Sequence, residues 1–481
     1  MKNIFRNSNS NIIRSLVLAF AFALLTHIPT AAAAATSPVQ VQMGSNAPVG
    51  RILSLELVVN SVQLVTSKGV SVPLVATPFT LEQSHLAASA EVVGHANLPT
   101  GTYTKAVINS GNPHVIFLDN FGNLREARWT GSSVSTVVLK QPISATTAAS
   151  VIRISLNMGS LVSFNPALQL VYRTQPTFTV SQWSPARTGA DAEVAGELEP
   201  AIGRVTAVAA SSFTVTDVVN GLVTTYLTDH NTAYNGLSPR TMPNLLVRIH
   251  ATTRSDGQLL AEEVTVAGSG AGAIVTGIIT DYAGTKLTTQ QAYGAGATIT
   301  MLGSNSNITL DAASSFEVES RGMDLTGLNV TFGSANLVPG QRIQFLSRAS
   351  IQNSAATGAS LTHALTARLQ LQSISGTVTN IAQASNGGAS FDLILPANDS
   401  SPLTSLGEGS GIVHVVTQPL TKSVLTLSEG LAVRVRGLLL FDASPLGSQH
   451  ASARDGIVTP KDASNYYMIA RTMQRDSASH N

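Results

Sequence analysis

Cysteine is missing from this 481-residue chain, and charged and aromatic residues are scarce. Without cysteine the chain has no disulfide, no thiol nucleophile, no iron–sulfur ligand and no lipid-modified cysteine, so a lipoprotein is excluded. Charged residues make up 11% of the sequence, well below the roughly 25% of typical soluble proteins. Aromatic residues make up 5%, too few for the two interfacial girdles of a transmembrane barrel.

The charges that are present do not favour a nucleic-acid partner. Of the 28 Lys and Arg residues, three lie in the N-terminal leader (Lys2, Arg6 and Arg14), which leaves 25 against 27 acidic residues and a net charge of −2 for the remainder. No stretch gathers basic residues with interleaved aromatics, which is the pattern of a phosphate-binding surface. We therefore expect no nucleic acid among the partners.

Residues 1–35 have the pattern of a cleavable secretory signal peptide. A basic start precedes an apolar run from Leu16 to Leu25, Pro29 follows it, and residues 31–35 are all alanine, which suits cleavage. The apolar run is shorter than the roughly 20 residues that span a bilayer. An uncleaved N-terminal anchor is the alternative. We expect an exported protein, periplasmic or extracellular, with no membrane span after cleavage.

The rest of the chain is rich in Val, Thr, Ser, Ala and Gly, and hydrophobic residues make up 43% of the sequence, which favours β-strands around packed cores. Short alternating segments between Gly, Asn and Pro turns predict an antiparallel β-sandwich over residues 39–180. Residues 184–200 (SPARTGADAEVAGELEP) are predicted to be a linker, because this composition buries little surface. The predicted fold class is all-β.

A compact unit of about five or six strands follows the linker, the size of a small closed barrel. Its opening strand, Ile202–Ala207, is repeated in type at 274–280 and 374–379, and its late strand, Pro243–Ile249, is repeated at 339–345 and 429–435. We therefore expect about three barrel-like domains in tandem, at 201–267, 273–370 and 371–474, followed by a polar tail at 475–481. Arg248, Arg342 and Arg434 in the late strands are expected to face solvent.

Two stretches resemble families of exported bacterial proteins of unknown function. Residues 196–266 resemble the DUF 5666 family of small β-barrels through Gly203–Val208 (GRVTAV), Ser212–Val215 (SFTV) and Asp256–Val264 (DGQLLAEEV). The first module resembles the DUF 4382 family through Leu98–Thr104 (LPTGTYT) and Ile152–Met158 (IRISLNM). Neither resemblance implies an activity, a cofactor or catalytic residues.

Patterns for catalysis or metal binding are weak. No G-x-S-x-G nucleophile motif occurs, and His85, His95 and His114 do not have the spacing of metal ligands. Glutamates that could pair as glycosidase carboxylates are scattered along the chain: Glu91, Glu126, Glu197, Glu199, Glu262 and Glu263. We expect no enzyme, and no catalytic, cofactor-binding or metal site.

Aromatic side chains on a β-surface can hold the face of a sugar ring. Trp129, Trp183 and Tyr226 are the candidate ligand-binding residues, with a place in a core as the alternative for each tryptophan. The favoured function is an exported, non-catalytic structural or interaction protein of the bacterial cell envelope or extracellular space. The alternative is a protein of binding modules for carbohydrate or another envelope polymer. The expected partner is accordingly an envelope protein or a polysaccharide.

Overall fold

The structure, a computed structural model, describes most of the chain between residues 35 and 476. The described residues are 35–46, 51–183 (without 88, 122–123, 166 and 168), 197–268 (without 219 and 255), 274–282, 297–301, 306–347 (without 321–322, 327, 329 and 331), 361–396 (without 384–386), 403, 411–441 (without 424) and 466–476. The predicted signal peptide lies outside them apart from Ala35, as does most of the predicted tail.

Within these ranges the chain is built almost wholly from β-strands arranged in several sheets, so the predicted all-β, multi-domain fold is confirmed. The helical elements of this part are one turn of helix and three 3₁₀ turns: α2 (Met158–Leu161), η1 (Ser84–Leu86), η2 (Pro239–Thr241) and η3 (Ser334–Asn336).

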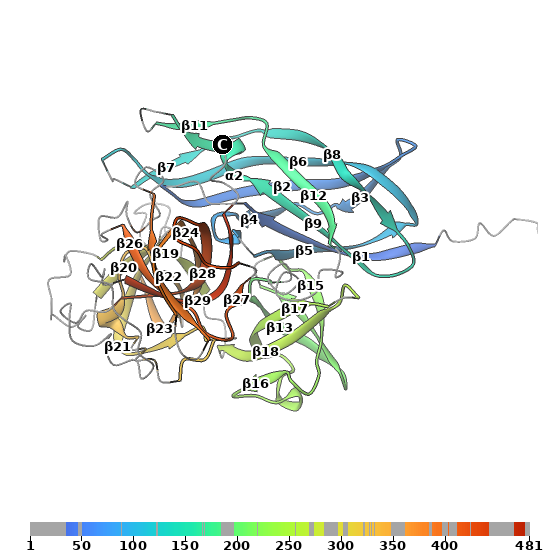
Figure 1. The fold of residues 1–481 in the computed structure, drawn as a ribbon. Helices are drawn as coiled ribbons and strands as arrows, with labels where there is room; N and C mark the ends of the chain where they lie inside the picture. The colour runs from blue at the N-terminus through green and yellow to red at the C-terminus, as the bar shows by residue number, and fades with distance from the viewer. Residues whose placement is uncertain are drawn as a thin grey trace, which may run out of the picture.

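Residues 36–183 form a sandwich of two sheets, seen at the top of Figure 1. The first sheet has the order β12-β9-β1-β5: Thr177–Trp183, Ser150–Asn157, Thr36–Ser45 and Glu91–Pro99. The second has the order β3-β2-β6-β7 (Ser71–Val75, Ile52–Thr66, Gly101–Leu118 and Leu124–Arg128), with β4 (Phe79–Glu82) on β2 and β8 (Ser132–Ala145) on β6. A hairpin of β10 (Val162–Phe164) and β11 (Leu170–Tyr172) follows α2. The β1–β9 pair is parallel and the other strand pairs of these sheets are antiparallel.

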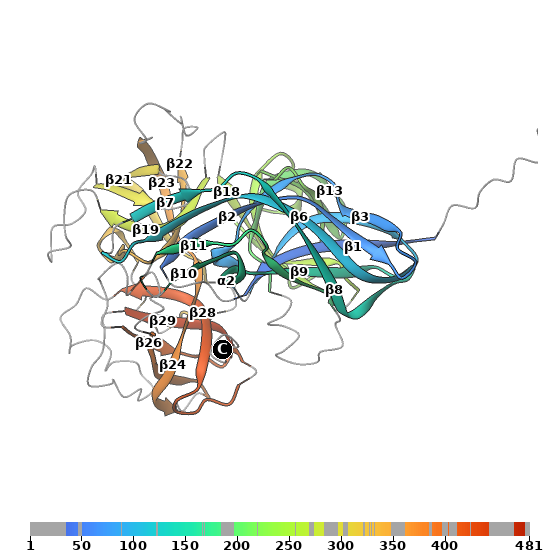
Figure 2. The same cartoon turned by 90° about the horizontal axis from the view of Figure 1, so that it is seen from above.

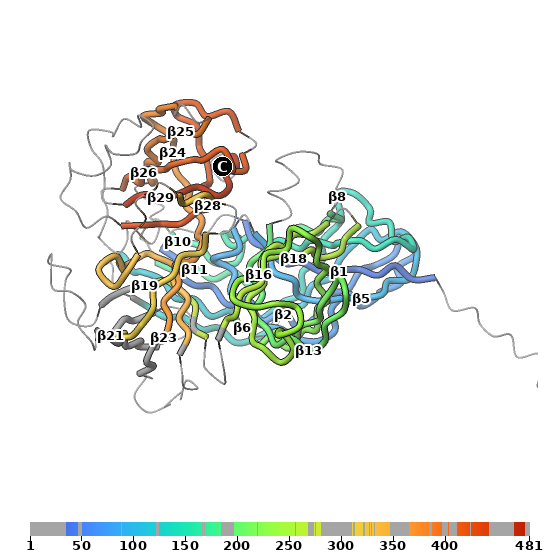
Figure 3. Tube along the Cα trace, turned by 90° about the horizontal axis from the view of Figure 1, so that it is seen from below, coloured from blue at the N-terminus to red at the C-terminus, as the bar shows by residue number. Residues whose placement is uncertain are grey.

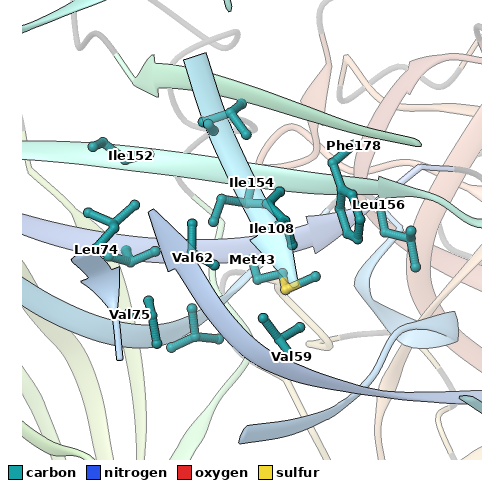
Figure 4. Packing of buried hydrophobic residues seen from close by; sticks show 14 of the residues in the cluster. Met43, Val59, Val62, Leu74, Val75, Ile108, Ile152, Ile154, Leu156 and Phe178 are labelled. Carbon is teal, nitrogen blue, oxygen red and sulfur yellow. The ribbon is translucent and has the colours of Figure 1, made fainter. Parts of the chain in front are cut away.

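The sandwich core lies between the two sheets, because alternate residues of a strand point to the same face. On β9 the side chains of Ile152, Ile154 and Leu156 are buried, and the residues between them are partly exposed. Figure 4 shows these side chains gathered with Val59 and Val62 of the opposite sheet.

Three five-stranded barrels follow, and all three have the same strand order. In each, the first strand pairs with the second and the fourth, and the fifth strand joins the fourth to the third. Barrel 1 consists of β13 (Ala201–Val208), β14 (Ser212–Asp217), β15 (Val223–Leu227), β17 (Leu246–Thr253) and β18 (Leu259–Gly268). Barrel 2 consists of β19 (Ile274–Tyr282), β20 (Ala297–Met301), β21 (Ser306–Val318), β22 (Arg342–Ser347) and β23 (Leu361–Leu369). Barrel 3 consists of β24 (Leu371–Gln383), β25 (Ala389–Ile394), β26 (Ile412–Val416), β28 (Ala432–Phe441) and β29 (Tyr466–Arg475).

Each barrel closes through one parallel pair. A ring with an odd number of strands cannot alternate in direction all the way round, so at least one neighbouring pair has to run the same way. The parallel pairs that close the rings are β15–β18, β21–β23 and β26–β29. The short strands β16 (Ala233–Asn235) and β27 (Lys422–Ser423) add to β18 and β29.

The barrels also repeat in detail. A glycine of the first strand lies opposite a Val or Ile of the fourth: Gly203 and Val247, Gly277 and Ile343, Gly376 and Val433. The turn before the fourth strand holds a residue with positive φ: Asn244 (65°), Gly340 (91°) and Gly430 (77°). The N–H of that turn residue donates to a first-strand carbonyl, of Val205, Ile279 and Val378 respectively. These matching positions mark three copies of one unit.

The barrels pack on the sandwich and on one another. Barrel 1 lies below β1 and β5 in Figure 1, and Figures 2 and 3 place barrels 2 and 3 at the end of the sandwich that carries β10 and β11. Leu53, Ile116 and Leu118 on the outside of the second sheet pack with Ile278 of barrel 2. A residue that points outward from its own module can therefore still be buried under a neighbouring module.

Candidate functional site: a buried charge junction between the modules

Ionised side chains lie buried where the modules meet. The late-strand arginines Arg248 and Arg434 are only 1% and 6% exposed, and Arg342 is half-buried. The prediction that they face solvent is therefore wrong for Arg248 and Arg434. Each points away from the core of its own barrel, as strand alternation requires, but for Arg248 another module lies where solvent was expected.

Arg248 connects barrel 1 to barrel 2. Its Nη2 donates to Glu319 Oε2 and to Gln370 Oε1, both at 2.7 Å, and its Nη1 donates to Gln344 Oε1 at 3.0 Å. His250 Nδ1 of the same strand lies 3.4 Å from the other oxygen of Glu319. Burial lowers the pKa of the Arg248 guanidinium, and the carboxylate of Glu319 opposes that shift. An ion pair so deeply buried needs such a set of partners to offset its loss of hydration.

The end of the predicted linker connects barrel 1 to barrel 3. Arg471 Nε donates to Glu197 Oε1 at 3.0 Å, and Arg436 Nη2 donates to Glu199 Oε1 at 2.6 Å. Between the two acids, Leu198 belongs to the core of barrel 1. Residues 197–199 are thus packed between modules, in contrast to the open linker expected from their composition.

Burial would raise the pKa of the Glu199 carboxyl, but the nearby guanidinium groups of Arg436 and Arg342 outweigh it and lower that pKa to about 2. Glu199 is therefore an anion under ordinary conditions. Its charge is balanced by arginines that come from two different barrels.

The sandwich joins this site through residues 82–91, which we call the docking segment. Ser89 Oγ donates to Glu199 Oε1 at 2.6 Å, and the backbone N–H of Glu199 donates to the carbonyl of Ala90 at 2.9 Å. From barrel 3, Ser373 Oγ donates to the carbonyl of Ala87 at 2.7 Å. The docking segment is thereby held by barrels 1 and 3 together.

His85 of the docking segment bridges two carboxylates. Its Nδ1 lies 2.6 Å from Glu82 Oε2, and its Nε2 lies 2.9 Å from Glu91 Oε1. Burial and the cation of Arg342 would lower the pKa of His85, but the hydrogen bonds to the two glutamates and the charge of Glu82 raise it to about 9. The imidazole is therefore a cation at neutral pH.

A second histidine, His114 on the second sheet, also lies between two carboxylates. His114 Nδ1 lies 3.0 Å from Glu56 Oε2, and its Nε2 lies 3.0 Å from Glu126 Oε1. Glu56 and Glu82 face each other across the β2–β4 pair. Among the described residues no three His, Asp or Glu side chains are arranged to hold a metal ion.

The three predicted aromatic ligand residues are not brought together. Tyr226 is 4% exposed and stacks on Phe213 at 5.6 Å between ring centroids, inside barrel 1. It is a core residue and cannot serve as an exposed platform. Trp183 is half-buried at the end of β12 in the first sheet.

Trp129 follows β7 of the second sheet and is half-buried. Its ring stacks on Tyr172 of β11, with centroids 4.6 Å apart and planes at 22°. Trp129 therefore retains an aromatic partner from a separate hairpin, although neither of the other predicted residues lies beside it.

In the sequence, Glu197 and Glu199 stand out only as possible glycosidase carboxylates, and His85 is one of several scattered histidines. In the structure each of the two glutamates forms an ion pair with its own arginine. The spacing E-x-E at 197–199 is the one local signal, because alternate residues of extended chain share a face. In the described part of the chain, no helix is long and apolar enough to cross a membrane.

One family model matches the chain. Residues 202–265, which correspond to barrel 1, match the domain of unknown function DUF5666. This match confirms the expected resemblance to the DUF 5666 family for this barrel. No curated protein matches the chain.

Two solved structures have partial similarity to the chain. One is described as "drosophila Unr CSD456"; the identity is 9%, the match covers 49% of this chain and 83% of that one, and the TM-score is 0.13. The other is a multidomain protein with nucleic acid binding domains from Streptococcus pneumoniae; the identity is 11%, the coverage is 51% and 69%, and the TM-score is 0.11. At such TM-scores neither similarity supports an inference.

Proposed function

We propose that this chain is an exported, non-catalytic structural or interaction protein of the bacterial cell envelope or extracellular space. One observation carries the proposal: buried ion pairs join the modules, with Arg248–Glu319 between barrels 1 and 2 and Glu199–Arg436 between barrels 1 and 3. If each module acted alone, flexible links between the modules would be sufficient, and buried ion pairs between them would not be needed.

The energetics of buried ion pairs support this interpretation. A buried pair contributes little net stability, because desolvation cancels most of the attraction, and in some proteins such a pair serves to select one arrangement over others. The contacts at this junction therefore favour a scaffold that presents the outer faces of its modules in a fixed relation. Such a scaffold suits recognition of an extended partner.

Export, and the resemblance of the first module to the DUF 4382 family, are part of the same proposal. They rest on the leader pattern and on the quoted motifs. Nucleic acid is not a proposed partner, because the chain without its leader carries a net charge of −2 and has no basic stripe with aromatics.

A second candidate function is binding of carbohydrate or another envelope polymer. The stacked pair of Trp129 and Tyr172 favours it, since an aromatic platform beside polar groups is a common way to hold a sugar ring. Arg128, which precedes Trp129 in the sequence, is 65% exposed and pairs through Nε with Glu126, so a charged and hydrogen-bonding group lies near in the chain. Both rings are also packed against the sandwich core, so this function ranks second.

Co-sedimentation of the leader-free protein with isolated cell envelopes tests both functions. Pelleting that is lost when the envelopes are first treated with protease supports a protein partner. Pelleting that survives protease and is lost in Trp129→Ala, but not in Trp183→Ala, supports the polymer. A protein that stays in the supernatant contradicts both.

A further inference from the structure

The loop between His85 and Glu91 makes hydrogen bonds from the sandwich to Glu199 and to barrel 3. Ala87, Ser89 and Ala90 make the hydrogen bonds to Ser373 and Glu199 described above. The ends of this loop are joined by the contact of 2.9 Å between His85 Nε2 and Glu91 Oε1. The docking surface is therefore presented by a loop whose two ends this ion pair joins.

The geometry at His85 requires a doubly protonated ring. Carboxylates accept hydrogen bonds and do not donate them, and both ring nitrogens lie within hydrogen-bond distance of a carboxylate oxygen. A neutral imidazole carries one N–H, so its other nitrogen would direct a lone pair at a glutamate. Loss of the proton must break one of the two contacts.

The Glu91 contact is the one expected to break. Glu82 is held in place by further donors, from the N–H of Leu55 and from Ser84. Glu91 has 31% of its side chain exposed and lies at the first residue of β5, where water can replace the imidazole. The loop would then open while Glu82 stays where it is.

We propose that the docking segment, residues 82–91, is a pH-dependent latch. Protonated His85 holds this segment against barrels 1 and 3, and deprotonation of His85 releases it. The charged groups around His85 come from every neighbouring element. Glu82 on β4 and Glu91 on β5 stabilise the cation, Glu199 ahead of β13 adds a more distant attraction, and Arg342 on β22 opposes it.

The direction of the pH effect follows from the same groups. The pKa of His85 is raised from 6.5 to about 9, so its contribution is complete below pH 6.5 and is lost as the pH rises through about 9. The pKa of Glu82 is lowered from 4.5 to about 2, because the His85 contacts outweigh the effect of burial, so its contribution is complete above pH 4.5 and is lost as the pH falls towards 2. The latch is fully closed between these limits.

Distance measurements between the modules test the latch. The chain has no cysteine, so Thr136→Cys in β8 and Ile394→Cys in β25 place a fluorophore pair on the sandwich and on barrel 3. We expect the energy-transfer efficiency to stay constant from pH 5 to 6.5 and to change at higher pH, with the midpoint of the change near pH 9. His85→Gln should show the alkaline value at pH 5.5 and no midpoint. A constant efficiency from pH 5 to 10, or an unchanged midpoint in His85→Gln, would overturn the latch.

Two further variants serve as controls for this experiment. His114→Gln removes the other carboxylate-bridged imidazole, which lies outside the docking segment, and should leave the midpoint unchanged. Glu91→Gln keeps the shape of the side chain and should lower the midpoint, because the cation loses one carboxylate. If far-UV circular dichroism shows that His85→Gln does not fold, the midpoint of Glu91→Gln decides: a value equal to that of the parent contradicts the latch.

Discussion

Glu199 and Arg436 are separated by 237 residues in the chain, yet a carboxylate oxygen of one and a guanidinium nitrogen of the other lie 2.6 Å apart in a buried site. Glu199 also accepts a hydrogen bond from Ser89, so the sandwich, barrel 1 and barrel 3 meet at one carboxylate. This contact is the clearest sign that the modules form a single assembly.

Removal of the Glu199 charge should destabilise the protein strongly. Glu199→Gln keeps the shape of the side chain but leaves the guanidinium of Arg436, 2% exposed, without its counter-charge. Breaking one side of a buried pair typically costs about 3–5 kcal/mol. Urea unfolding at pH 7 measures the cost. The matched control is Asp256→Asn, whose pair with Arg254 is exposed and should contribute less than about 1 kcal/mol.

The effect of Glu199→Gln should disappear in acid. Because the pKa of Glu199 is lowered to about 2 by Arg436 and Arg342 against the effect of burial, its contribution is present above pH 4.5 and is lost as the pH falls towards 2. We expect the difference in unfolding free energy between parent and variant to shrink steadily over that interval. A difference that is the same at pH 7 and pH 2.5 would show that the charge is not responsible.

Gly437 should not tolerate a side chain. A Cβ atom there would lie 2.1 Å from the carbonyl oxygen of Ile469, at the irregular pairing between β28 and β29. Gly437→Ala has to displace backbone, so we expect a loss of about 1–3 kcal/mol in thermal or urea unfolding. Gly333→Ala is the control, since its nearest neighbour would be 3.9 Å away. Equal stability of the two variants would contradict the described pairing.

Tyr226 should behave as a core residue. Tyr226→Ala removes a buried ring that stacks on Phe213, and the expected loss is about 3–5 kcal/mol. Tyr226→Phe keeps the ring and should cost less than about 1 kcal/mol. Denaturation of both variants provides the comparison. If Tyr226→Ala is as stable as the parent, the ring does not contribute to the core of barrel 1.

The repeated barrels could be predicted because their signals are local. Gly203 and Gly376 and the turn residues Gly340 and Gly430 are visible in the sequence, and each is required by close backbone approach or by a positive φ. Closure of the third barrel could not be predicted, because it depends on the pairing of β26 with β29, and these strands lie far apart in the chain.

The charge junction could not be predicted in the same way. Strand alternation correctly places Arg248 on the outside of its barrel, but it does not say whether water or another module lies beyond. For Arg248 the partner Glu319 comes from barrel 2, and for Glu199 the partner comes from barrel 3. The sequence does not show which face of β15 points into the barrel, so Tyr226 could not be recognised as a core residue before the fold was known.

Cross-linking in intact cells that express the full chain tests the central claim most directly. A structural or interaction protein of the envelope should be recovered in covalent complexes with at least one envelope protein, and mass spectrometry should place the linked lysines on the outer faces of the modules. Recovery of the chain only as an unlinked monomer, under conditions that trap known envelope complexes, would contradict the account.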